Sequence, residues 1–116
     1  MAVWEPTSQK PAAARSDELN SARMTFEWDE RKAAANFKKH SVGFEEAASV
    51  FLDSLAITFP DPDHSLEERR EITLGYTMEG RLVFISHCER GQRIRIISAR
   101  LAARIERKQY EEGIGS

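Results

Sequence analysis

Side chains that can transfer protons and bind anions lie together around one predicted β-hairpin. Two apolar runs rich in β-branched residues flank a short polar segment that contains Gly91, a pattern typical of antiparallel strands joined by a tight turn. His87 lies near the end of the first run, over 82–88, Glu89 opens the polar segment, and Arg93 and Arg95 begin the second run. A carboxylate or an imidazole can act as a general base or acid, and planar guanidinium groups match the oxygens of a phosphate.

The register of this hairpin decides which of these groups can meet. A three-residue loop over residues 90–92 would pair Glu89 with Arg93 and His87 with Arg95, and would place all four on one face. A loop of two or four residues would instead pair Cys88 with Arg93 and His87 with Ile94, and would split the set. We favour the three-residue loop because it gives a consistently apolar opposite face, with Phe84, Ser86, Cys88, Ile94 and Ile96.

The hairpin lies in a basic segment of a weakly acidic protein. Residues 81–108 hold eight Lys or Arg and two acidic residues, so this window carries +6 in a chain of formal net charge −2. Residues 24–80 hold six basic and twelve acidic residues, which gives −6. A cationic sheet beside a cationic helix favours a polyanionic ligand, because binding follows the local field within a Debye length of about 8 Å.

The elements that would position these groups follow the order β-α-α-β-β-β-β-α. Asp29 precedes a segment with acids first and bases last, which predicts a capped helix over residues 30–40. Periodicity predicts a second helix over 44–52, a final helix over 99–112 capped by Ser98, and strands over 24–28, 55–59, 70–77, 82–88 and 93–98. Strands joined by short turns imply an antiparallel sheet packed against the two N-terminal helices, with a C-terminal helix, in an α+β domain.

Length and composition predict one domain, over residues 24–113 of the 116, with a flexible tail over 1–23 and a short tail over 114–116. We expect a cytoplasmic protein, because no segment has the apolar length of a membrane span and the N-terminus lacks the apolar core of a secretory signal. Cys88 is the single cysteine, and the three histidines (His40, His64 and His87) are far apart. We therefore expect no metal site and no cofactor.

Several motifs carry a resemblance to a known family. They are Phe-Glu-Trp-Asp-Glu at 26–30, Lys-His at 39–40, Phe-Glu-Glu-Ala at 44–47, the segments 61–65 and 68–75, Glu-Arg-Gly at 89–91, Arg-Ile-Arg-Ile-Ile-Ser-Ala-Arg at 93–100 and the segment 106–110. Together they resemble the BrnT family, ribonuclease toxins of bacterial type II toxin-antitoxin operons. The resemblance implies a RelE-like fold and a cognate DNA-binding antitoxin that wraps the toxin. Operator DNA would be bound only through the antitoxin complex.

The resemblance also implies a reaction, metal-independent RNA cleavage by attack of the 2′-OH on the adjacent phosphate. Such chemistry needs a base near the 2′-OH, cations on the transition state and an acid for the leaving oxygen. Glu89 is the first candidate for the base, although a Glu beside arginines is often only an ion-pair partner, and His87 could serve as base or acid or be structural. Arg70 and Arg95 are candidate phosphate-binding residues. Arg90, Arg93, Arg100, Arg104 and Arg107 would form a wider surface for RNA or the antitoxin, or else an ordinary solvated face.

Two other functions fit the same residues. A non-catalytic nucleic-acid-binding module or corepressor would bind through the same arginines, with an affinity that falls steeply with salt, and would release no cleavage products. A scaffold for a partner protein would have no measurable affinity for nucleic acid.

Overall fold

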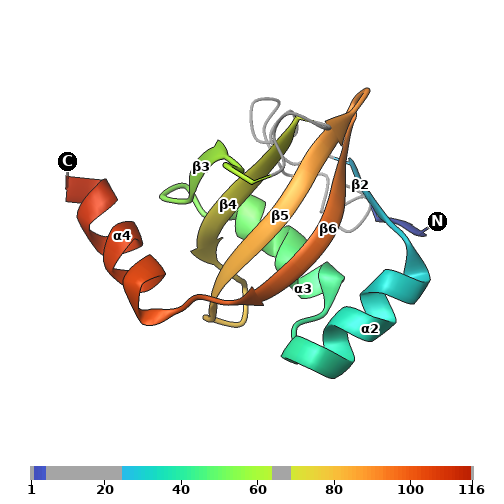
Figure 1. Ribbon diagram of the computed structural model, residues 1–116, viewed down its shortest axis with the longest axis horizontal. Coiled ribbons are helices and arrows are strands. Elements are labelled where there is room, and N and C mark those ends of the chain that lie inside the picture. Colours follow the sequence, from blue (N-terminus) through green and yellow to red (C-terminus); the bar gives the residue numbers. More distant parts are fainter. Residues whose placement is uncertain (1, 5–24, 64–68, 116) are drawn as a thin grey trace, which may run out of the picture.

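A mixed β-sheet forms the centre of the molecule (Figure 1). The computed structural model describes residues 2–4, 25–63 and 69–115. Within these residues the sheet has six strands in the spatial order β1-β2-β6-β5-β4-β3. The strands are β1 (Ala2–Trp4), β2 (Thr25–Trp28), β3 (Ile57–Pro60), β4 (Arg70–Tyr76), β5 (Leu82–Arg90) and β6 (Arg93–Leu101).

The prediction of an antiparallel sheet is wrong at one pairing. Strands β3, β4, β5 and β6 form the expected antiparallel series, but β2 lies parallel to β6. Parallel strands need a long crossover connection, and here the whole chain between Trp28 and Arg93 provides it. Strand β1 pairs with β2 from within the segment predicted to be a tail, and residues 5–24 of that segment lie outside the described residues. The α+β class stands, with a mixed sheet.

Two helices and a 3-10 helix pack on one face of the sheet: α2 (Glu30–His40), α3 (Phe44–Ala48) and η2 (Ser49–Leu52) (Figure 1). Helix α2 begins as predicted, because the Asp29 side chain accepts hydrogen bonds from the backbone N–H groups of Arg31 and Lys32. The helix predicted over 44–52 is divided into α3 and η2. Phe26 and Ile85 of the sheet lie in the core that these helices cover.

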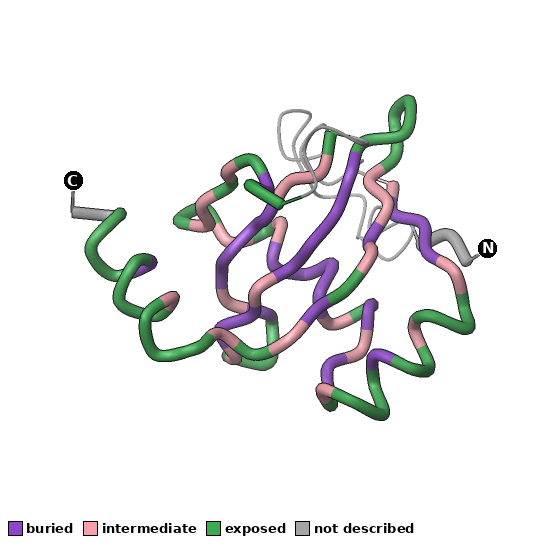
Figure 2. Tube along the Cα trace, in the orientation of Figure 1, coloured by how far each residue is buried: buried purple, intermediate pink, exposed green. Residues whose placement is uncertain are grey.

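Alternation along β5 assigns side chains to the two faces. Val83 and Ile85 belong to the core beneath the helices, whereas Leu82 and Phe84 pack on the opposite side with Tyr110. We call this opposite side the open face; Figure 1 looks onto it, with α3 behind the strands. In Figure 2 the middle of β5 is buried, while the β5–β6 hairpin tip is exposed.

The C-terminal helix α4 (Arg104–Gly115) starts later than predicted, and Ser98 is not its cap. Ser98 and Arg100 pair with β5 instead, so β6 continues to Leu101. The backbone N–H before the helix is satisfied by Glu106, whose Oε1 accepts from Ala103 N at 2.8 Å. Helix α4 is mostly exposed (Figure 2). Its buried Tyr110 packs with Leu74 of β4.

A buried amide connects α2 to β6. Asn36 Nδ2 donates to Val42 O at 3.1 Å and to Ala99 O at 2.7 Å, and Ala99 N donates to Asn36 Oδ1 at 3.1 Å. The side chain of Asn36 therefore satisfies both backbone groups of Ala99.

Candidate active site

The β5–β6 hairpin has a register that the sequence did not predict. Its loop contains two residues, Gly91 and Gln92, so Arg90 pairs with Arg93 and Cys88 with Arg95. Gly91 has a φ of 65°, a conformation that favours glycine. The favoured three-residue loop is therefore wrong.

The register also overturns the expected grouping of side chains. His87 pairs with Ile96, not with Arg95 or Ile94, and Glu89 pairs with Ile94, not with Arg93. Because neighbouring residues of a strand point to opposite faces, a slip of one residue moves a side chain across the sheet. The ladder also has an irregularity between Ser86 and His87, which a uniform alternation could not anticipate. His87 and Arg95 consequently lie on opposite faces.

A row of side chains crosses four strands on the open face. Cys88 of β5 pairs with Arg70 of β4 on one side and with Arg95 of β6 on the other. Arg95 is in turn the neighbour of Glu27 on β2. We call Arg70, Cys88, Arg95 and Glu27 the cross-strand row. Arg70 and Arg95, predicted to bind phosphate, are thus brought to one surface.

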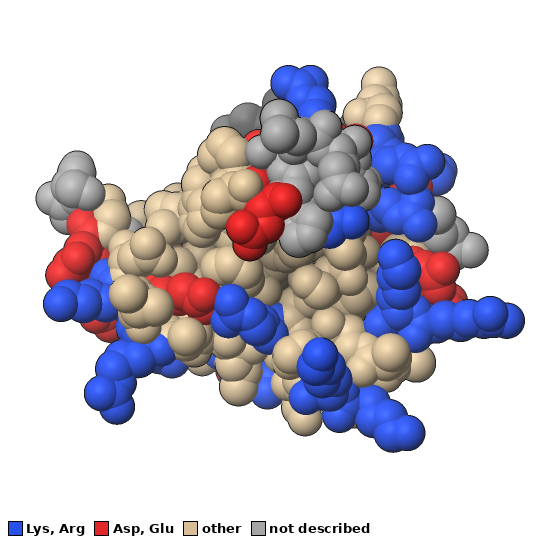
Figure 3. All heavy atoms as spheres, viewed as in Figure 1, with Lys and Arg blue, Asp and Glu red and all other residues tan. Residues whose placement is uncertain are grey.

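Glu27 contacts two guanidinium groups from β6. Its Oε1 lies 3.5 Å from Arg93 Nη1, and its Oε2 lies 3.8 Å from Arg95 Nη1. Only 7% of Glu27 is exposed, yet the residue borders a hollow of about 470 Å³ together with Arg90, Gly91, Gln92 and Arg93. Figure 3 shows Lys and Arg side chains gathered near this hairpin and β2.

Sequence reasoning missed Glu27 as a candidate. Its partner strand β6 is more than 60 residues away along the chain, and the pairing is parallel, so no local pattern connects Glu27 to Arg95. The available signal was a carboxylate between two large aromatic residues, Phe26 and Trp28, in a short alternating strand. A charged residue in such a position is buried only where cations compensate it.

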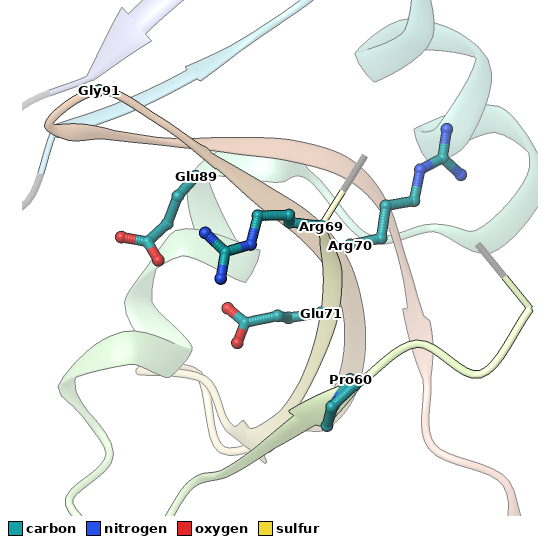
Figure 4. Close-up of a pocket in the computed structure, with 6 residues that line it drawn as sticks. All are labelled: Pro60, Arg69, Arg70, Glu71, Glu89 and Gly91. Atoms are coloured by element: carbon teal, nitrogen blue, oxygen red, sulfur yellow. The ribbon is translucent and has the colours of Figure 1, made fainter. Parts of the chain in front are cut away.

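Glu89, the first candidate for the base, lies in a different hollow. That hollow of about 510 Å³ is lined by Pro60, Arg69, Arg70, Glu71, Glu89 and Gly91. In Figure 4 the side chains of Glu89, Arg69 and Glu71 point toward one another, and the Arg70 side chain points away from them. Glu89 shares the helix-covered side of β5 with His87 and lies apart from Arg95.

His87 is buried beneath η2. Only 3% of it is exposed, its ring contacts Phe51 edge to face at 5.0 Å, and its Nε2 lies 2.6 Å from Thr73 Oγ1. Burial lowers the pKa of His87 from 6.5 to about 4. Its Nδ1 has no hydrogen-bond partner within the described part of the chain. An unpaired lone pair costs less than an unpaired N–H, so we assign the neutral tautomer in which Nε2–H donates to Thr73.

The remaining predicted RNA-binding residues lie in three places. Arg90 and Arg93 are exposed at the hairpin, beside the cross-strand row. Arg100 lies on β6 rather than on a helix, with its guanidinium 4.1 Å from the centre of the Phe84 ring and its Nη atoms donating to Glu106 at 2.8 and 2.7 Å.

That hydrogen bonding to Glu106 raises the pKa of Arg100 and commits the side chain to a structural contact. Arg104 and Arg107 are exposed on α4, where Arg107 Nη1 donates to the Tyr76 hydroxyl at 3.3 Å.

The described residues contain neither a candidate metal site nor a candidate membrane-spanning helix. Within them, no group of three or more His, Cys, Asp or Glu residues could hold a metal ion. Among the same residues, no helix has the length and apolar character needed to cross a membrane. His64 lies outside the described residues.

Comparison with known proteins gives a family match and a structural match. Residues 28–106 match the model of a family described as the ribonuclease toxin, BrnT, of type II toxin-antitoxin system. The fold is similar to the 1.1 Å crystal structure of the Brucella abortus ribonuclease toxin BrnT, with a TM-score of 0.53 and 25% sequence identity. That alignment covers 66% of this chain and 94% of the Brucella chain. No curated protein sequence matches the chain.

Proposed function

Because the chain belongs to the BrnT family of ribonuclease toxins of type II toxin-antitoxin systems, we propose that it cleaves RNA on its open face, at the cross-strand row. The observation that carries this proposal is the placement of Arg70 and Arg95 on either side of Cys88. Neighbouring strands lie about 4.8 Å apart, so the backbones of the two arginines are about 10 Å apart. Both long side chains can then reach one phosphodiester between them.

The proposed reaction needs no metal ion. The 2′-OH of the RNA attacks the adjacent phosphate, which leaves a 2′,3′-cyclic phosphate and a 5′-OH. The guanidinium groups supply the positive charge that the pentacoordinate transition state requires, and their planar forks match its oxygens. Strand β4 and strand β6 hold Arg70 and Arg95 on backbone that is paired on both sides, which preorganises the site.

The family supports an antitoxin as the partner and RNA as the substrate. We propose that the cognate DNA-binding antitoxin neutralises the toxin by covering the open face, and that operator DNA is bound only through that complex. A RelE-like classification of the sheet and a cytoplasmic location belong to the same proposal.

The test is cleavage of RNA by the purified, antitoxin-free protein in EDTA. We expect a product with a 2′,3′-cyclic phosphate, and a loss of about 100- to 1,000-fold in kcat/KM for Arg70→Ala and for Arg95→Ala. Arg31→Ala is the matched control, because it removes one exposed arginine from α2, on the other face of the sheet. Salt-sensitive RNA binding without any cleavage by the wild type would refute the proposal and favour a nucleic-acid-binding module.

A further inference from the structure

We infer that Glu27 is the general base that takes the proton of the attacking 2′-OH. The inference rests on the proposed ribonuclease function and assigns its base to a residue on the open face. Neither Glu89 nor His87 fits this position, because both are on the helix-covered side of β5 and His87 is buried. Glu27 is the carboxylate of the cross-strand row, next to Arg95.

The surroundings of Glu27 combine burial with access. The side chain is only 9% exposed, so its carboxylate is held by the sheet rather than moving freely in water. It nevertheless borders the hollow of about 470 Å³ beside the hairpin, a volume within the usual range of ligand sites. A ribose at the mouth of this hollow would bring its 2′-OH to a fixed acceptor, with the exposed Arg90 and Arg93 around it.

The distances to the two guanidinium groups favour a base over a structural ion pair. At 3.5 and 3.8 Å, the contacts of Glu27 with Arg93 and Arg95 are longer than charge-assisted hydrogen bonds, which measure about 2.7–2.9 Å. By comparison, Arg100 and Glu106 meet at 2.7 Å. The oxygens of Glu27 are thus electrostatically compensated while they retain the capacity to accept a hydrogen bond from a substrate hydroxyl.

The charges of the site remain balanced throughout the proposed step. In the resting protein, the carboxylate of Glu27 compensates positive charge from Arg93 and Arg95. When the 2′-oxygen forms its bond to phosphorus, the 2′-OH proton moves to Glu27 and one negative charge appears on the phosphorane oxygens. The bond between phosphorus and the 5′-oxygen then breaks, the departing oxygen takes a proton from water, and Glu27 gives its proton to the hydroxide that remains, which restores the carboxylate. The guanidinium groups face the negative charge of Glu27 before the proton transfer and the added negative charge of the phosphorane after it. The site therefore needs no large reorganisation.

The experiment is a steady-state comparison of wild type, Glu27→Gln and Glu27→Asp on one RNA in EDTA across a range of pH. Gln keeps the size of the side chain but does not accept a proton, so we expect kcat to fall by about 100- to 10,000-fold. The pH profile of kcat should differ between the wild type and Glu27→Gln, because only the wild type has a carboxylate at the position of the base. Glu27→Asp keeps a carboxylate and should keep the shape of the wild-type profile at a lower kcat.

Two further measurements separate a base from a residue that only supports the site. Glu27→Gln should bind an RNA with 2′-deoxyribose at the cleavage position as tightly as the wild type or more tightly, because it has lost a negative charge near the phosphate. Glu30→Gln, an exposed acid at the start of α2, is the matched control and should cleave like the wild type. Loss of analogue binding in Glu27→Gln would overturn the inference, since it would show a structural role.

Failure of the inference and failure of the proposed function give different results. If the wild type releases no cyclic-phosphate product, the proposed function fails and the base has no reaction to serve. If the wild type cleaves and Glu27→Gln matches its kcat and its pH profile, only the inference fails. Loss of kcat in Glu89→Gln with retention in Glu27→Gln would overturn the inference in favour of the base predicted from the sequence.

Discussion

Acidification from pH 7 to pH 5 should destabilise the folded protein through His87. The folded state holds this imidazole neutral, because burial lowers its pKa to about 4, whereas an unfolded chain exposes it with a pKa near 6.5. Between these two values the unfolded state binds more protons than the folded state. The stability linked to His87 is therefore fully present above pH 6.5 and is lost as the pH falls toward 4.

The size of the effect follows from the two pKa values. A histidine with a pKa of about 4 when folded and 6.5 when unfolded contributes a loss of about 2 kcal/mol at pH 5 and about 3 kcal/mol at pH 4. The exposed fraction of His87 is only 3%, so solvent screening reduces this contribution little. Protonation would also place a second N–H at Nδ1, for which the described residues offer no acceptor.

The assay is urea unfolding of the wild type and of His87→Gln at pH 7 and pH 5. Gln does not titrate and can still donate to Thr73, so the variant removes the proton uptake while it keeps a polar partner for that hydroxyl. Carboxylates that lose stability in acid do so in both proteins, and they cancel in the comparison. The wild type should lose about 2 kcal/mol more than His87→Gln. Losses that agree within about 0.5 kcal/mol would refute this account of His87.

Three other substitutions test the packing and hydrogen bonding of the fold. In Gly75→Ala the new Cβ would lie 2.8 Å from the Ala56 Cβ, so we expect the unfolding free energy to fall by about 1–3 kcal/mol. In Gly113→Ala, within α4, the nearest atom to the new Cβ would be 3.7 Å away, so we expect the unfolding free energy to rise by about 0.5–1 kcal/mol. Thermal unfolding of the two variants in parallel tests this, and equal effects would contradict it. Tyr110→Phe removes the 2.8 Å hydrogen bond to Asp53 and should cost about 1 kcal/mol in urea. Burial, with Asp53 as a further cause, raises the pKa of Tyr110 to about 12, so absorbance titration of the wild type should show a tyrosinate near pH 12 that is missing from the variant.

The elements set by local chemistry could be predicted from the sequence. Helix α2 begins and ends where the Asp29 cap and the trailing bases indicated, and β4 and β5 start within a residue of their predicted positions. These features depend on residues a few positions apart, which a window of sequence contains. The prediction failed at the start of α4, where Ser98 has the chemistry of a cap but its pairing with Ser86 continues the strand.

The site was harder to predict because it depends on register and on distant pairing. Arg70 and Arg95 could be predicted as phosphate-binding residues because guanidinium groups match phosphate oxygens. The structure places both on one face of the sheet, where they can share one phosphate. The partners proposed for them were wrong, since a two-residue turn at Gly91 reverses the faces of His87 and Glu89 relative to Arg95. Glu27 reaches the site only through the parallel pairing of β2 with β6, and nothing near it in the sequence specifies that pairing.

The Asn36 side chain occupies an edge of β6 at which a second copy of this chain could otherwise add a strand. Among the described residues, β2 pairs with β6 only from Arg93 to Arg95, and no other described strand lies along this edge of β6 beyond Arg95. The Asn36 amide occupies both the N–H and the C=O of Ala99, as a neighbouring strand would. A chain that adds to β6 at this point must first displace a buried side chain. One residue of α2 thus blocks this edge of β6 against intermolecular β-pairing, and we expect Asn36→Ala to aggregate more readily than the wild type.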